Sequence, residues 1–217
     1  MQRKAKRYFL VGGALFLLFA LFTVLVARFD VKPIGPGQSA VGFAGVNQFM
    51  FERVGVHLVW YHITDWLDVI AILFAFGFAA VGLGQLVKRR SIRKVDGTIL
   101  VLGVFYLLVI AAYLFFENVV INCRPVILGE SLEASYPSSH TMIVVCIMVT
   151  AVMQFRMLCS QKSRLCAAVD FAAVVIVVVT VLGRLISGVH WFTDIVGGLL
   201  LSSALIMLYR AAIECVT

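Results

Sequence analysis

Long apolar stretches dominate this sequence and constrain its fold more than any other feature. Of the 217 residues, 62% are hydrophobic and only 13% are charged, whereas a soluble globular domain carries about 25% charged residues. A chain of this composition cannot cover a water-facing surface in the ordinary way. We therefore expect residues 1–217 to fold as one domain embedded in a lipid bilayer.

The apolar stretches are long enough to cross a membrane, because a spanning helix needs about 20 mostly apolar residues. The sequence predicts six such helices, at about 8–27, 67–87, 97–116, 139–156, 167–184 and 193–210. The intervening stretch of about 30–65 opens with turn-forming Pro and Gly residues. It ends with aromatic and polar residues typical of an interface: Trp60, Tyr61, His62, Asp65 and Trp66. We expect an all-α integral membrane bundle of six transmembrane helices, with an interfacial helix between the first and second.

The distribution of basic residues predicts the orientation. With the N-terminus inside, five of the 18 Lys and Arg residues lie outside: Arg28, Lys32, Arg53, Arg124 and Arg184. The other thirteen, Lys162 among them, lie inside. By the positive-inside rule, both termini face the cytoplasm of a multi-pass plasma-membrane protein. Because this pattern accounts for the net charge of +7, we expect no nucleic-acid partner.

Three polar segments then lie at the same extracytoplasmic face of the membrane. Glu117–Pro125 follows the third predicted helix, Tyr136–His140 opens the fourth, and Gly183–Asp194 joins the fifth to the sixth. Ionisable residues near hydrocarbon are costly and usually mark function. We therefore expect an active site where these segments meet.

The basic and hydroxyl residues of these segments suit a phosphate group. The guanidinium groups of Arg124 and Arg184 can each bind phosphate through a planar pair of donors. Ser138 and Ser139 stand at a helix start, where hydroxyls and free backbone N–H groups can hold phosphate oxygens.

The histidines add the groups needed for phosphoryl transfer. His190 and Asp194 are four residues apart on one face of a helix start. The carboxylate can fix the imidazole tautomer and leave the other ring nitrogen free to attack. His140, from another helix, can protonate the leaving group. The arginines and helix-terminal amides can supply the charge stabilisation, so we expect no metal and no cofactor.

These segments resemble the signature of the type-2 phosphatidic acid phosphatase superfamily, which reads Lys-x6-Arg-Pro, Pro-Ser-Gly-His and Ser-Arg-x5-His-x3-Asp. The sequence offers Arg124-Pro125, Pro137-Ser138-Ser139-His140 and Arg184-x5-His190-x3-Asp194, in the same order. Three motifs in order are far more specific than one alone. The six-helix layout is also similar to the membrane branch of that family.

The resemblance implies roles for the site residues. His190 would form a phosphohistidine with Asp194 as its partner, His140 would be the acid, and Arg124, Ser138 and Arg184 would bind phosphate. The implied reaction is metal-independent dephosphorylation of a membrane lipid phosphate or pyrophosphate. The implied substrates are undecaprenyl pyrophosphate, phosphatidic acid and phosphatidylglycerol phosphate. A lipid phosphotransferase that uses the same phosphohistidine is the alternative enzyme.

Three positions depart from the family pattern. Gly183 replaces Ser, Ser139 replaces Gly, and Glu117 replaces the Lys of the first motif. A carboxylate about 4 Å from a phosphate costs several kcal/mol at an effective dielectric constant near 20. Glu117 could form an ion pair with Arg124, or its carboxyl group could be protonated. Alternatively, the side chain of Arg53 or Lys32 could supply the positive charge that the family lysine would provide. It also leaves open a catalytically inactive lipid-binding relative.

Overall fold

The computed structural model describes residues 3–158 and 164–217, so Lys162 lies outside the described residues. Six helices in these ranges are long and apolar enough to cross a membrane, which confirms the predicted all-α membrane bundle. They are α1 (Arg3–Arg28), α3 (Leu58–Arg89), α4 (Gly97–Asn118), α5 (Ser139–Leu158), α6 (Arg164–Ile186) and α7 (Phe192–Val216). Helices satisfy their backbone polar groups internally, which hydrocarbon requires of a spanning segment.

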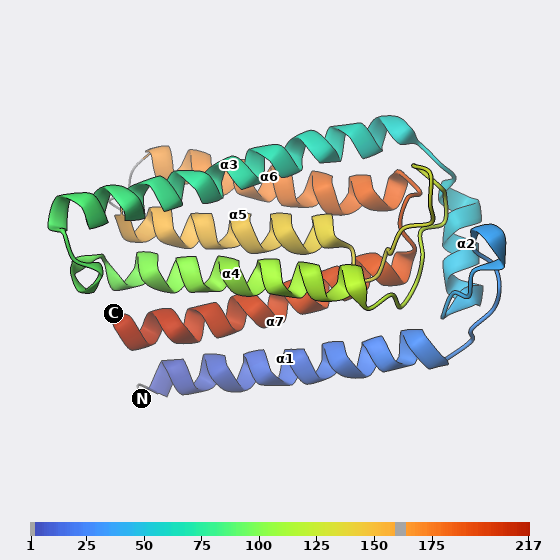
Figure 1. Ribbon diagram of the computed structural model, residues 1–217, viewed down its shortest axis with the longest axis horizontal. Helices are drawn as coiled ribbons and strands as arrows, with labels where there is room; N and C mark the ends of the chain where they lie inside the picture. The colour runs from blue at the N-terminus through green and yellow to red at the C-terminus, as the bar shows by residue number, and fades with distance from the viewer. Residues whose placement is uncertain (1–2, 159–163) are drawn as a thin grey trace.

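The bundle has a protein-facing centre and a lipid-facing periphery. In the most apolar window of α5 and of α7, 56% of the residues are buried, compared with 11% for α3 and 17% for α1. Helix α5 packs against α3, α6 and α7, while α1 packs along α7. Large hydrophobic side chains on the outer helices are exposed, as expected where lipid replaces water. Both termini lie at the same end of the bundle (Figure 1).

The short helix α2 (Ala44–Val54) is the expected helix between the first two spans, and it lies across the end of the bundle opposite the termini (Figure 1). The side chain of Asn47 ties it to the start of α7. Asn47 Nδ2 donates to Thr193 Oγ1 at 2.9 Å, and the backbone N–H of Thr193 donates to Asn47 Oδ1 at 3.1 Å. Two short 3-10 helices, η1 (Pro36–Gln38) and η2 (Ile92–Lys94), lie in the loops.

The start of the second spanning helix differs from the prediction. Helix α3 begins at Leu58 instead of about residue 67, so the aromatic and polar stretch from Trp60 to Trp66 belongs to it and not to the interfacial helix. Two of its polar side chains, those of Thr64 and Asp65, have partners within the bundle. Thr64 Oγ1 donates to the carbonyls of Trp60 and Tyr61, and Asp65 pairs with Arg184. Its 32 residues span about 48 Å, which exceeds the roughly 30 Å of a hydrocarbon core.

Candidate active site

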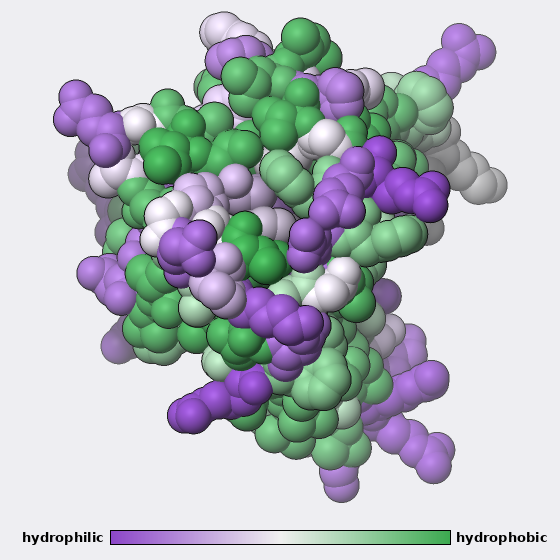
Figure 2. Space-filling view, turned by 90° about the vertical axis from the view of Figure 1, so that its right-hand side faces the viewer, coloured by the Kyte–Doolittle hydropathy of each residue, from purple (hydrophilic) through white to green (hydrophobic). Residues whose placement is uncertain are grey.

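The predicted site residues gather at the end of the bundle opposite the termini. The first turns of α3, α5 and α7, the last turn of α6 and the α4–α5 loop all reach this end (Figure 1). Figure 2 looks onto it and shows hydrophilic side chains across the middle of the face, with hydrophobic side chains around them.

His190 lies in the tight turn between α6 and α7 and is only 3% exposed. Gly188 permits this turn, because its φ is +68° and a Cβ there would lie 2.2 Å from the carbonyl oxygen of Gly55. His190 Nδ1 lies 3.6 Å from Asp194 Oδ2. Among the described residues, neither ring nitrogen of His190 has a well-aligned hydrogen-bond partner, although the backbone of Ser135 lies close enough to interact with the ring.

The electrostatic surroundings keep His190 neutral. Burial lowers its pKa well below the usual value, and the charges of Arg124 and Arg184 lower it further. The carboxylate of Asp194 accepts from the backbone N–H of Trp191 at 2.9 Å and from Asn122 Nδ2 at 3.4 Å, and the side chain of Ser135 is a further donor. A neutral imidazole beside a fixed carboxylate is suited to nucleophilic attack.

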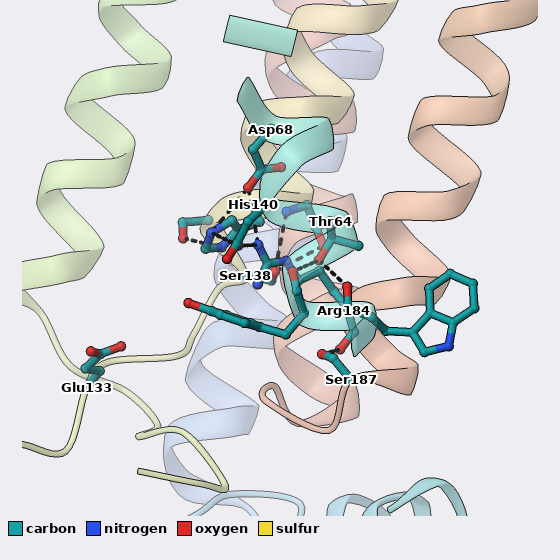
Figure 3. A network of polar contacts seen from close by, with 12 residues as sticks. Thr64, Asp68, Glu133, Ser138, His140, Arg184 and Ser187 are labelled. Atoms are coloured by element: carbon teal, nitrogen blue, oxygen red, sulfur yellow. Dashed lines mark hydrogen bonds and ion pairs between the residues drawn. The ribbon is translucent and has the colours of Figure 1, made fainter. Parts of the chain in front are cut away.

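His140 stands at the start of α5, and its ring faces that of His190 at a centroid distance of 6.2 Å. Its Nε2 lies 3.2 Å from Asp68 Oδ2 and 3.6 Å from Asp65 Oδ1, both on α3. Figure 3 shows Asp68 pointing toward His140. The second histidine therefore also has carboxylate partners, which come from a different helix.

Arg184 ends α6 with a side chain that is completely buried. Its Nη2 pairs with Asp65 and lies 3.3 Å from Asp68 Oδ2. The guanidinium also lies 5.0 Å from the centre of the Tyr61 ring, a cation–π contact. Its Nε and Nη1 have no hydrogen-bond partner among the described residues. Two donors of Arg184 thus remain for an anion.

Arg124 lies on the α4–α5 loop and is 8% exposed. Its Nε lies 2.9 Å from Glu133 Oε2, and its backbone N–H donates to the carbonyl of Glu133 at 3.0 Å. Within the described part of the chain, Nε and Nη1 have no aligned hydrogen-bond acceptor. The ion pair with Glu133 fixes the position of the guanidinium, while Nη1 keeps its donors unused.

The two serines differ from each other. The backbone N–H of Ser138 donates to the carbonyl of Asp194 at 2.9 Å, and its hydroxyl donates to Thr141 Oγ1 at 3.1 Å. The expected free amide of Ser138 is therefore already engaged, and it ties the start of α5 to α7. Ser139 Oγ lies 3.5 Å from His140 Nδ1, and Ser139 lines the cavity beside the site.

Gly183 allows α3 to approach α6 closely. A Cβ at this position would lie 2.6 Å from Thr64 Cγ2 and 3.2 Å from the Trp60 ring. A serine, as in the family pattern, would require α3 to move away. The replacement of Ser by Gly thus leaves room for α3 to pack closely, and α3 brings two carboxylates to the site.

Glu117 lies on the wall of a cavity of about 650 Å³ beside His140. The cations considered as its partners lie elsewhere. Arg124 pairs with Glu133, Lys32 pairs with Asp30 at 2.8 Å, and Arg53 lies over the ring of Phe49. Neither Lys32 nor Arg53 is among the residues that line this cavity. The expected ion pair between Glu117 and Arg124 is therefore wrong, and so is the expectation that Arg53 or Lys32 takes the place of the family lysine.

The sequence reasoning missed the role of Asp65 and Asp68. They are three residues apart, so both project from one face of α3. With His140 they offer ligand atoms within 4.8 Å of one another, a spacing compatible with a metal ion. In the structure, Arg184 supplies the positive charge to both carboxylates. Carboxylates within an apolar helix were the available signal, but their partners lie far away in the sequence.

Comparisons with known proteins identify the family and the fold. The family model described as the PAP2 superfamily matches residues 98–214. A crystal structure of the first transmembrane PAP2 type phosphatidylglycerolphosphate phosphatase from Bacillus subtilis is similar in fold, with a TM-score of 0.61. The similarity covers 95% of this chain and 97% of that chain, at 21% sequence identity. A comparison with curated protein sequences gives no match.

Proposed function

Because the chain belongs to the PAP2 superfamily, we propose that it is a membrane lipid phosphatase with His190 as its nucleophile. The reaction is removal of a phosphoryl group from a membrane lipid phosphate or pyrophosphate. Undecaprenyl pyrophosphate, phosphatidic acid and phosphatidylglycerol phosphate are the substrates to test first. The similar fold of the Bacillus subtilis phosphatidylglycerolphosphate phosphatase supports this class.

The observation that carries the proposal is a group of buried nitrogen atoms without acceptors. Among the described residues, Nη1 of Arg124 and both Nε and Nη1 of Arg184 are buried without a hydrogen-bond acceptor, and neither ring nitrogen of His190 has a well-aligned partner. A buried donor left unpaired costs about 1–3 kcal/mol, so such a concentration requires a reason. A phosphoryl group supplies several acceptor oxygens to the arginines and an electrophilic phosphorus to the histidine.

In the first step, His190 attacks phosphorus through the ring nitrogen that does not face Asp194. A nitrogen–phosphorus bond forms and the bond from phosphorus to the lipid oxygen breaks. His140 donates a proton to that oxygen, so a lipid monophosphate substrate releases its neutral alcohol and a lipid pyrophosphate releases the protonated lipid monophosphate. Arg124 and Arg184 stabilise the negative charge on the remaining phosphoryl oxygens.

In the second step, water hydrolyses the phosphohistidine. His140, now unprotonated, accepts a proton as the water oxygen bonds to phosphorus and the nitrogen–phosphorus bond breaks. Inorganic phosphate leaves, and His190 is again a neutral imidazole. The carboxylate of Asp194 stabilises the positive imidazole ring during both steps. No metal ion takes part in this scheme.

We also propose that the site faces the extracytoplasmic side of the plasma membrane. The site and the termini lie at opposite ends of the bundle (Figure 1). Thirteen of the 18 Lys and Arg residues belong to the terminal side in the predicted topology, which supports a cytoplasmic location for both termini. A lipid tail can then remain in the outer leaflet while its phosphate enters the site.

Phosphate release from the three lipids in detergent micelles tests the proposal. We expect release by the wild type that falls by more than about 10³-fold in His190→Gln, because both transfer steps need this side chain. His62→Gln, an exposed histidine outside the site, is the matched control and should be fully active. Equal, near-zero release by the wild type and His190→Gln would contradict a phosphatase and favour an inactive lipid-binding relative.

A phosphotransferase would give a different result in the same assay. Its phosphohistidine would pass the phosphoryl group to an acceptor alcohol instead of water. Phosphate release independent of added alcohol supports the hydrolase. Turnover only in the presence of an acceptor would replace the hydrolase with the transferase.

A further inference from the structure

The cavity beside His140 has an unusual charge for a phosphate-binding site. Its volume of about 650 Å³ is within the range of small-molecule sites. Four carboxylate residues line it: Asp65, Asp68, Glu117 and Glu133. The arginine on its wall is Arg124, and the guanidinium of Arg184 lies behind the two aspartates.

The arginines do not balance these carboxylates. Arg184 is shared between Asp65 and Asp68, and Arg124 pairs with Glu133. Glu117 has no ion pair with any described residue, although it stands where the family pattern has a lysine. The four carboxylates thus face two arginines and, in the acid form that donates its proton, His140. Negative charge is still in excess, and a ligand carrying only negative charge would add repulsion.

A second feature of the cavity indicates that a negative group does bind there. Arg124 is 8% exposed, lines the cavity and has an Nη1 without an acceptor among the described residues. The cavity therefore presents an unused donor for an anion beside an excess of carboxylates. A ligand with both a phosphate and a positive group matches this combination, and neither charge alone does so.

We propose that the preferred substrate is a lipid phosphate with an ammonium group a few bonds from the phosphate. This inference rests on the proposed phosphatase function. The phosphate binds Arg124 and Arg184 beside His190. The ammonium group binds the carboxylate of Glu117. The lipid chain extends out of the cavity along its apolar wall, which Ile72 and Ile143 form. Glu117 is thus the residue that determines specificity, and the amino alcohol and inorganic phosphate are the products.

The proposal narrows the substrates expected from the sequence. Undecaprenyl pyrophosphate and phosphatidic acid carry no ammonium group, and neither does phosphatidylglycerol phosphate. A primary amine on an alkyl chain is protonated at neutral pH, as a lysine is. The difference between an amine and its amide therefore isolates the effect of this one charge.

The test compares a 2-amino long-chain alkyl phosphate with its N-acetyl derivative, which keeps the phosphate and chain but has no positive charge. Wild-type kcat/KM should be at least about tenfold higher for the amine. Glu117→Gln, which keeps the side-chain shape, should bring the two values within about threefold. Glu117→Lys should reverse the preference, because an ammonium group then repels an ammonium group.

A matched control changes charge without changing the cavity. Glu52→Lys alters an exposed carboxylate on α2 at the same end of the molecule, and the preference should stay as in the wild type. The melting temperature and elution profile in detergent establish that each variant is folded.

Two failures can be distinguished. If the wild type hydrolyses both phosphates equally or prefers the amide, or if Glu117→Gln and Glu117→Lys leave the wild-type ratio unchanged, the ammonium specificity is wrong while the phosphatase remains. If the wild type releases phosphate from neither compound and from none of the three lipids above, the proposed function itself is wrong.

Discussion

The two histidines of the site meet their carboxylates in different ways. Asp194 follows His190 by one helical turn, and both side chains are buried. The partners of His140 are Asp65 and Asp68, which come from α3 and are shared with Arg184. One pair is local and enclosed, whereas the other joins three helices and borders a cavity.

This difference indicates separate roles. A local, enclosed carboxylate fixes one tautomer of a nucleophile and changes little when substrate binds. A carboxylate pair shared between His140 and Arg184 positions two groups at once, and each aspartate can partly replace the other. Asp194 should therefore be indispensable, and Asp68 should be an auxiliary positioning residue.

Removing the charge of each carboxylate gives the largest expected contrast. Asp194→Asn should lower kcat by up to about 10⁴-fold, the scale for a catalytic histidine that loses its carboxylate. Asp68→Asn should lower it by only about tenfold, the equivalent of roughly 1.4 kcal/mol, because Asp65 remains. Steady-state kinetics on a lipid phosphate measures both, and similar losses in the two variants would contradict the division of roles.

The leaving group separates the acid from the nucleophile. His140→Ala should lower kcat for an alkyl lipid phosphate by about 10²–10⁴-fold, the usual contribution of general acid catalysis. The burst of 4-nitrophenol from 4-nitrophenyl phosphate, which reports the first step alone in rapid-mixing experiments, should fall much less, since this leaving group needs no proton. His190→Ala should abolish both reactions. A loss of equal size in the first-step rate of both substrates in His140→Ala would remove the acid role.

A smaller effect is expected where α3 meets α6. Gly183→Ala places a methyl group against Thr64 Cγ2 and should lower the free energy of unfolding by about 1–3 kcal/mol, the cost of overpacking. Thr64→Ser removes that methyl group but keeps the hydroxyl, so the double variant should recover much of the loss. Melting temperatures in detergent measure this, and an unaffected single variant would show that the close approach is not required.

The smallest expected effect is that of a chelator. Arg184 already provides the positive charge at Asp65 and Asp68, so EDTA should leave the rate unchanged within error. The control is addition of Mg²⁺ to the chelated enzyme. Loss of activity in EDTA with recovery in Mg²⁺ would instead assign Asp65, Asp68 and His140 as metal ligands.

The fold class could be predicted from the sequence, and so could the part of the site whose residues are close in sequence, namely the pair of His190 and Asp194. Apolar length alone identifies spanning helices, and the four-residue spacing of His190 and Asp194 predicted that they lie close together. The predicted shared helix face was wrong for His190, which lies in the turn before α7. The start of α3 was missed because an aromatic and polar stretch resembles an interfacial segment. Only the packing of that stretch against Arg184 shows why it continues a spanning helix.

The rest of the site depends on contacts between residues far apart in the sequence, which the spacing of residues along the chain does not predict. Asp65 and Asp68 lie outside the residues that the family model matches, and their partners belong to α5 and α6. The engagement of the Ser138 amide by Asp194 was also hidden, since it joins the starts of two helices distant in sequence. The partner of Arg124 proved to be Glu133, on the same loop, and not Glu117.

Detection of a phosphoryl group on His190 tests the account most directly. The enzyme is mixed with a lipid phosphate labelled on phosphorus, stopped within one turnover in alkaline denaturant, and mapped by mass spectrometry. The account predicts label on His190, absent in His190→Gln. Label on His140, or turnover with no labelled histidine, would contradict it.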